Sequence, residues 1–126
     1  MRYEKHITRQ MLKDEPDTLF VFGDNMVEKG LGGQAKEMRG EPNAVGIPTK
    51  NFPDMGKFDF FSDKDFDRAK VRIDAIFAFL VTNKALNKRE IVWPKDGIGT
   101  GLADLQNKAP KIWTLIEMYR LALEQL

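Results

Sequence analysis

Three short apolar runs, each followed by glycine or proline, constrain the fold of this chain more than any other feature. The runs are Leu19–Phe22, Ala44–Ile47 and Glu90–Trp93, and they are rich in the β-branched and aromatic residues that favour strands. They are continuously apolar, which is typical of parallel strands covered on both faces. We therefore expect an α/β fold with a small, mostly parallel or mixed sheet.

Helical patterns occupy the segments between and after these runs. The spacing of apolar residues predicts one long helix over Asp63–Asn83, which starts with a capping-box pattern, and another over Ala109–Leu123. A shorter helix is predicted over Gly32–Arg39, and partial alternation predicts an edge strand over Tyr3–Thr8. Alternating strands and helices in 126 residues indicate a single domain, residues 1–126, with three α/β/α layers.

Composition excludes several classes of site. The chain has no cysteine and only one histidine, so thiolate chemistry and multi-histidine metal sites are not expected, and no metal or resident cofactor is predicted. A formal net charge of +1 gives no reason to expect extended nucleic-acid binding. No apolar run is long enough for a membrane span and Met1–Gln10 does not resemble a signal peptide, so we expect a cytoplasmic protein without membrane contact.

The residues that follow the three runs are the candidate site, because ligands of open α/β sheets bind beyond the carboxyl ends of the strands. Several glycines let the backbone approach a ligand closely and leave amides free for an anion, although tight turns use glycine too. After the first run the candidates are Gly23, Asp24, Asn25, Gly30, Leu31, Gly32, Gly33 and Gln34.

The second and third runs lead into further candidates. Thr49 and Lys50 follow the second run, and the lysine pairs with a phosphate, acts as a nucleophile or is a solvated surface residue. The third run leads into a glycine loop that suits a cradle of N–H groups around phosphate oxygens. The loop lacks the Gly-Lys-Ser/Thr ending of a Walker motif and the spacing of the dinucleotide fingerprint. Its candidates are Gly97, Ile98, Gly99, Thr100, Gly101 and Leu102.

One irregular segment, Asn51–Phe61, is rich in aromatic residues. Its aromatic side chains either pack over the sheet or form a wall of the ligand pocket. The sequence leaves both alternatives open.

Three of these motifs, in this order, resemble the macrodomains, a family of ADP-ribose-binding modules. They are Gly30–Ala35, Ile47–Lys50 and Gly99–Leu102, and the likeness extends from about Leu19 to Glu117. The chain is most similar to the compact branch of ADP-ribosyl glycohydrolases that act on protein or DNA. A looser likeness links it to bacterial and phage proteins that carry V-F-G-x-N and I-P-T-K.

The resemblance implies a macrodomain-like fold and roles for particular residues. Ile98–Leu102 would hold the diphosphate of ADP-ribose, and Gly30–Gln34 would close over the distal ribose, with Asn25 nearby. In the glycohydrolases a lysine that matches Lys50 attacks the anomeric carbon. An aspartate that assists release directly follows the glycine loop in those enzymes.

The sequence departs from the family at that aspartate. Ala103 follows Leu102 and Asp104 comes one residue later, so Asp104 is either the second catalytic group or a helix-start residue. Asp24 and Asp96 are alternative acids, and Asp24 is also a candidate partner of the adenine amino group. Two functions follow: hydrolysis of ADP-ribosyl bonds on a nucleobase or protein carboxylate, or a non-catalytic module that reads or sequesters ADP-ribose-derived nucleotides.

Overall fold

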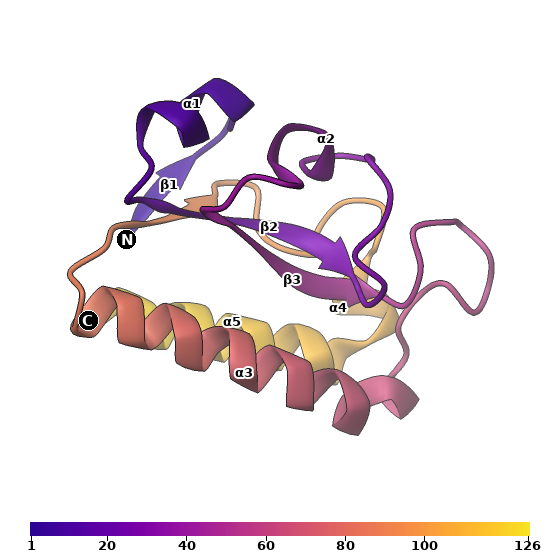
Figure 1. The fold of residues 1–126 in the computed structure, drawn as a ribbon. Coiled ribbons are helices and arrows are strands. Elements are labelled where there is room, and N and C mark those ends of the chain that lie inside the picture. Colours follow the sequence, from indigo (N-terminus) through magenta and orange to yellow (C-terminus); the bar gives the residue numbers. More distant parts are fainter.

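The computed structural model describes residues 1–126 and arranges them in three layers (Figure 1). A four-stranded parallel sheet forms the middle layer. The short helices α1 (Arg9–Asp14) and α2 (Ala35–Met38) lie on one face, and the long helices α3 (Phe66–Ala85) and α5 (Pro110–Glu124) cover the other. The predicted α/β/α arrangement with a small parallel sheet is confirmed.

The strand order places the predicted site loops along one edge of the sheet. The strands are β1 (Arg2–Glu4), β2 (Leu19–Asn25), β3 (Ala44–Lys50) and β4 (Ile91–Pro94), in the spatial order β1-β4-β2-β3. All neighbouring pairs are parallel. The carboxyl ends of β4, β2 and β3 therefore lie next to one another, where a parallel sheet binds its ligands.

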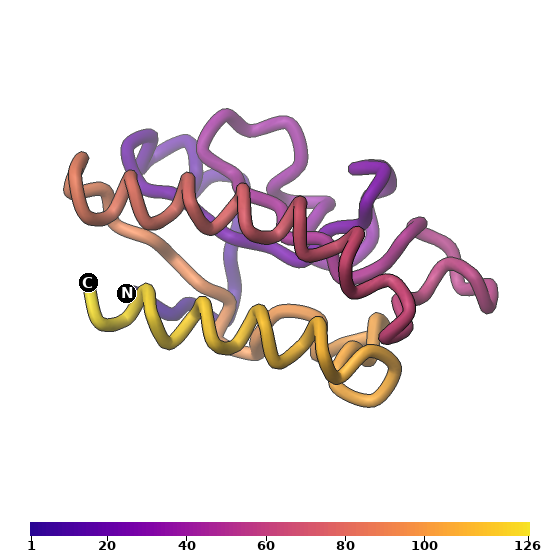
Figure 2. Tube along the Cα trace, turned by 90° about the horizontal axis from the view of Figure 1, so that it is seen from below, coloured from indigo at the N-terminus to yellow at the C-terminus, as the bar shows by residue number.

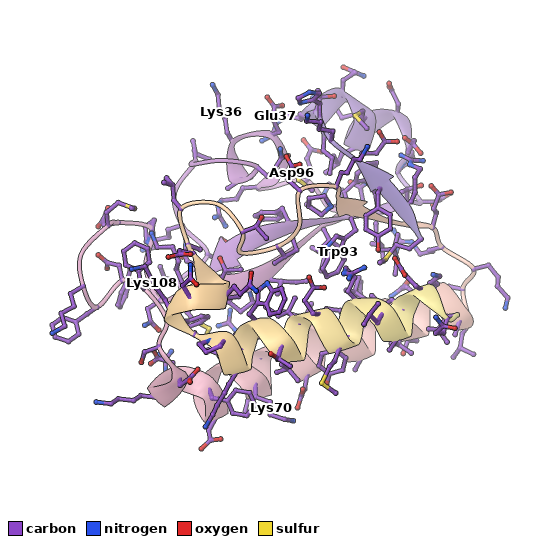
Figure 3. All side chains as sticks on the ribbon, turned by 180° about the vertical axis from the view of Figure 1, so that it is seen from behind. Lys36, Glu37, Lys70, Trp93, Asp96 and Lys108 are labelled. Atoms are coloured by element: carbon purple, nitrogen blue, oxygen red, sulfur yellow. The ribbon has the colours of Figure 1, made fainter.

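Burial on both faces explains why the strands are continuously apolar. Leu19 and Val21 pack into the larger core between the sheet and the long helices. Phe20 and Phe22 point to the opposite face and pack into the smaller core beneath α1 and α2. Trp93 of β4 belongs to the larger core and lies between the sheet and the long helices (Figure 3).

The two long helices run side by side across the sheet (Figure 2). Ile73 and Phe77 of α3 and Ile112 and Ile116 of α5 are fully or almost fully buried, at the helical spacing that the sequence predicts. Both chain termini lie at the same end of the molecule, opposite the carboxyl ends of the strands (Figures 1 and 2).

The starts of both long helices follow their local sequence signals. Ser62 accepts a hydrogen bond from the Lys64 amide while the Asp65 carboxylate accepts from the Ser62 amide. The first turn after Ser62 is a 3-10 helix, η1 (Asp63–Asp65), and α3 begins at Phe66. Pro110 occupies the first position of α5, where a missing N–H has no consequence.

Two local predictions need correction, and one short helix was not predicted. The edge strand predicted over Tyr3–Thr8 is wrong: β1 covers Arg2–Glu4, and Thr8 instead caps α1. The helix predicted over Gly32–Arg39 is reduced to α2, because Gly33 has a positive φ of 55°. The short helix α4 (Leu105–Lys108) was not predicted, because it is too short to show an apolar repeat.

The strands also extend further than predicted. β2 continues through Gly23 and Asp24 to Asn25, and β3 continues through Thr49 to Lys50. These candidate site residues are thus held by the sheet and not by flexible loops. None of the helices is both long and apolar enough to cross a bilayer.

Candidate functional site

A cavity of about 340 Å³ lies at the carboxyl ends of β2, β3 and β4. This volume is at the lower end of the range for small-molecule sites. Most of the predicted site residues line it: Gly23, Asp24, Asn25, Gly30, Gly32, Gly33, Gln34, Thr49, Lys50, Gly97, Gly99, Thr100, Gly101 and Leu102. Leu31, Ile98 and Asp104 do not, and the structure adds Lys29, Ala35, Arg39, Pro53, Met55, Pro94 and Ala103.

The loop after β4 is held at its ends and leaves its central amides free. The Gly97 amide donates to the Pro94 carbonyl, and the Thr100 hydroxyl donates to the Asp96 carbonyl. No backbone N–H from Ile98 through Ala103 donates to any protein acceptor. Because the Ile98 side chain is buried in the larger core, the loop is anchored while its donors remain available for an anion.

The three glycines of this loop are required for different reasons. Gly97 and Gly99 have positive φ angles, and a Cβ on Gly99 would lie 2.8 Å from Leu105 Cδ2. The fold alone therefore accounts for both. Gly101 has no positive φ, and a Cβ there would meet nothing within 4 Å. The fold leaves this glycine unexplained, and close approach of a ligand would explain it.

The loop after β2 shows the same combination of anchoring and free amides. The Asn25 carboxamide accepts from the amides of Val27 and Lys29 and donates to the Lys29 carbonyl. Asn25 therefore shapes the loop and has little capacity left for a ribose. The amides of Gly30–Gln34 have no protein acceptor, and the buried Oε1 atom of Gln34 has no donor.

Asp24 is paired with a residue that the sequence analysis did not single out, Arg39. The Arg39 Nη2 atom lies 2.5 Å from Asp24 Oδ1, and Nη1 lies 3.1 Å from Oδ2. The carboxylate is almost fully buried, and its hydrogen bond raises the pKa of Arg39 above the usual arginine value. This bidentate pair leaves Asp24 with reduced capacity to accept from an adenine amino group.

Lys50 lies at the cavity wall but its ammonium group is already engaged. Nζ donates to the carbonyls of Asp54 at 2.5 Å and Pro53 at 3.4 Å, and it contacts Met55 Sδ at 3.7 Å. The Phe60 ring lies 4.6 Å from the same nitrogen. A nucleophilic amine needs a lone pair directed at the ligand, whereas this nitrogen donates to the neighbouring loop.

Asp104 lies beyond the cavity lining. It directly precedes α4 and has a φ of 46°, and its Oδ1 atom accepts a hydrogen bond from the Asn107 side chain. Asp104 thus stands at the start of a helix, but its side chain makes no capping hydrogen bond to a backbone amide of α4. Asp96 is exposed and is not among the lining residues, so the cavity holds no carboxylate except the paired Asp24.

None of the aromatic residues in the segment after β3 lines the cavity, although two other residues of the segment do. Phe61 is buried in the larger core, whereas Phe52 and Phe58 are exposed. Pro53 and Met55 line the cavity, and a Cβ on Gly30 would lie only 3.0 Å from Pro53 Cβ. The segment, which projects beyond the sheet in Figure 1, therefore forms one wall of the cavity against the first glycine loop.

The cavity is electropositive although the whole chain is nearly neutral. Lys29, Arg39 and Lys50 line it together with the single carboxylate of Asp24. Since Asp24 is paired with Arg39, the two lysines add uncompensated positive charge to the free amides. No group of three His, Cys, Asp or Glu side chains is placed to hold a metal ion.

Comparison with known proteins places the chain in a family. The model of a family described as "Family of unknown function (DUF7831)" matches residues 2–119. The chain belongs to this family. The DUF7831 match includes all four strands and every residue that lines the cavity. Neither a search of curated proteins nor a search of solved structures found a match.

Two basic residues of the cavity in this DUF7831 chain, Arg39 and Lys29, could not be predicted from the sequence, for the same reason. Arg39 follows a short helix and Lys29 lies in a polar stretch, where basic residues are usually solvated. Only the packing of α2 against β2 brings Arg39 to Asp24, fifteen positions earlier. The one available signal was Asp24 itself, a carboxylate inside an apolar strand that needs a partner.

Proposed function

We propose that this protein binds ADP-ribose or a related nucleotide diphosphate in the cavity at the carboxyl ends of β2, β3 and β4. The observation that carries the proposal is the pair of glycine loops that line one cavity with unpaired backbone amides, Ile98–Ala103 and Gly30–Gln34. Most of the residues in these two loops are exposed, so their N–H groups are open to water and to a ligand in the cavity. Phosphate oxygens are acceptors that such groups bind well.

Charge supports a dianionic ligand. Lys29 and Lys50 add positive charge to a lining whose single carboxylate is neutralised by Arg39. A diphosphate carries two negative charges. It is also long enough to reach two clusters of donors, which matches the two glycine loops of the cavity. The nucleotide part of the proposal rests on the resemblance of these loops to macrodomain motifs.

The geometry favours binding over hydrolysis. The Lys50 nitrogen donates to the loop carbonyls of Pro53 and Asp54, and Asp104 lies outside the lining. The cavity therefore offers neither a free nucleophile nor an unpaired carboxylate to serve as acid or base. A module that holds the nucleotide without cleaving it is the function that these contacts support best.

Calorimetric titration with a ligand series tests the proposal. We expect one-to-one binding of ADP-ribose, weaker binding of AMP, which lacks the diphosphate, and no binding of adenosine. Thr100→Glu should abolish the signal, because it places a carboxylate beside the free amides. Equal affinity for adenosine and ADP-ribose would contradict a phosphate-directed site.

A second assay separates binding from catalysis. The purified protein is incubated with ADP-ribosylated nucleosides and ADP-ribosylated glutamate, and free ADP-ribose is measured. We expect no release above that of the Lys50→Ala variant. Release that disappears in Lys50→Ala would show that the lysine leaves its loop acceptors and acts as a nucleophile.

A further inference from the structure

The segment between β2 and β3 is closed at its base by one side chain, that of Arg39. Besides its bidentate pair with Asp24 at the end of β2, the guanidinium donates through Nε to the Gly30 carbonyl at 2.8 Å and through Nη2 to the Lys29 carbonyl at 3.2 Å. These acceptors belong to the end of β2 and to the start of the glycine loop, whereas Arg39 itself directly follows α2. The Arg39 guanidinium therefore joins the start of the glycine loop, at Lys29 and Gly30, and the chain that follows α2 to the end of β2.

The sheet is shaped to receive this pair. Gly46 of β3 lies beside Asp24, and a Cβ at that position would come within 2.7 Å of Asp24 Oδ2. On the other side, the Arg39 guanidinium lies 5.8 Å from the centre of the Phe22 ring. The absence of a side chain on Gly46 thus leaves room for the carboxylate, and the aromatic ring supports the cation.

Other contacts restrain the two ends of this loop. The Lys29 carbonyl also accepts from the Asn25 side chain, and the carbonyls of Gly32, Gly33 and Gln34 accept from amides of α2. The Gly30 carbonyl, between these ends, accepts from Arg39 alone. The loop amides from Gly30 to Gln34 make no hydrogen bonds within the protein, and Gly32 and Gly33 have no neighbours at the position of a Cβ. A glycine-rich loop of this kind populates many conformations unless something outside it fixes the backbone. The contacts of Arg39 are well placed to do so.

We propose that Arg39 is a positioning residue that fixes the Lys29–Gln34 loop so that its free amides are preorganised for an anionic ligand. The inference rests on the proposed function for its ligand, but the ordering of the loop is a property of the free protein. Lysine cannot replace the arginine, because an ammonium group is a point charge without the planar fork that reaches Asp24 and two carbonyls together. Without the fork, the ligand must order the loop when it binds.

The test measures ¹⁵N relaxation in the free protein together with ADP-ribose affinity. In Arg39→Lys, we expect the order parameters of Gly30, Gly32 and Gly33 to fall to about 0.6 or below, from the roughly 0.85 of a rigid backbone. The amides of Gly99 and Gly101 should not change. ADP-ribose affinity should fall about tenfold or more, since even one backbone residue ordered on binding costs a free energy of that size.

Arg89→Lys is the matched control, because Arg89 also donates to two backbone carbonyls, those of Asp17 and Pro16, but lies away from the cavity. It should leave both the loop dynamics and the affinity unchanged. Asp24→Asn, which retains volume but removes the charge, serves as the second variant if Arg39→Lys does not fold.

The outcomes are distinguishable. If the loop of a folded Arg39→Lys or Asp24→Asn variant stays as rigid as in the wild type, the positioning role is wrong. If the loop loosens but the wild type binds no ADP-ribose, the positioning role stands and the proposed ligand is wrong. A lower melting temperature with unchanged loop dynamics would indicate a general structural role and would also overturn the inference.

Discussion

The substitution Gly101→Ala should lower ligand affinity but not the stability of the fold. A Cβ on Gly101 meets no atom within 4 Å, and its φ is not positive, so alanine fits without strain. Because alanine restricts the unfolded chain, the free energy of unfolding should stay the same or rise by up to about 1 kcal/mol. For a chain of 126 residues this is a rise in melting temperature of roughly 4 °C at most.

Ligand binding should respond in the opposite direction. If phosphate oxygens approach the amides of this loop, the added methyl group obstructs at least one charge-assisted hydrogen bond, which contributes about 1.5–3 kcal/mol. The affinity for ADP-ribose should therefore fall by a factor of roughly 10 to 100. Thermal unfolding and calorimetric titration of the same sample measure the two effects.

Gly99→Ala is the contrasting variant. Residue 99 has a φ of 75°, and a Cβ there would lie 2.8 Å from Leu105 Cδ2. Together these two effects should lower the free energy of unfolding by about 2–5 kcal/mol. Wild-type affinity in Gly101→Ala would refute the anion cradle. A large loss of stability in Gly101→Ala would refute the account of the loop backbone.

Three further predictions concern the rest of the structure. Lys50→Met should accelerate tryptic cleavage after Lys57, because the loop after β3 loses the hydrogen bonds from Lys50 to the carbonyls of Pro53 and Asp54. Unchanged cleavage would contradict the role of Lys50 in holding this loop. The Asp74 carboxylate raises the pKa of Tyr119 to about 12, so the wild type should lose stability as pH rises from about 10 to about 12. Tyr119→Phe should show a smaller loss, since Tyr3, whose pKa is also raised by burial, remains; denaturant titrations across that pH range would measure the difference. Phe77→Ala should lower the free energy of unfolding by about 3–5 kcal/mol, because Phe77 is fully buried, and a loss below about 1 kcal/mol would contradict its place in the core.

The fold could be predicted to a large extent because its strongest signals are local. The continuous apolar runs at Leu19–Phe22 and Glu90–Trp93 reflect burial on both faces of the sheet, and the long helices show a clear apolar repeat. β1 and α1 are short and carry few apolar residues, so their pattern is too weak to separate Arg2–Glu4 from the residues that follow.

The candidate site could be predicted as a set of loops but not as a set of interactions. Glycines after strands indicate where the backbone is exposed, and the parallel topology then brings Gly30–Gln34 and Gly97–Leu102 to one cavity. The partners of Asp24 and Lys50 depend on tertiary packing and are invisible in the local sequence. Those partners change the chemistry, because both groups are engaged in holding loops.

An NMR titration of the ¹⁵N-labelled wild type with ADP-ribose tests whether the free amides of the two glycine loops bind phosphate. We expect saturable shifts concentrated in the amides of Ile98–Ala103 and Gly30–Gln34, because these groups gain phosphate acceptors that they lack in the free protein. Amides of α3 and α5 on the opposite face should hardly move. No shifts at millimolar ADP-ribose, or shifts that avoid both loops, would contradict phosphate binding by these amides.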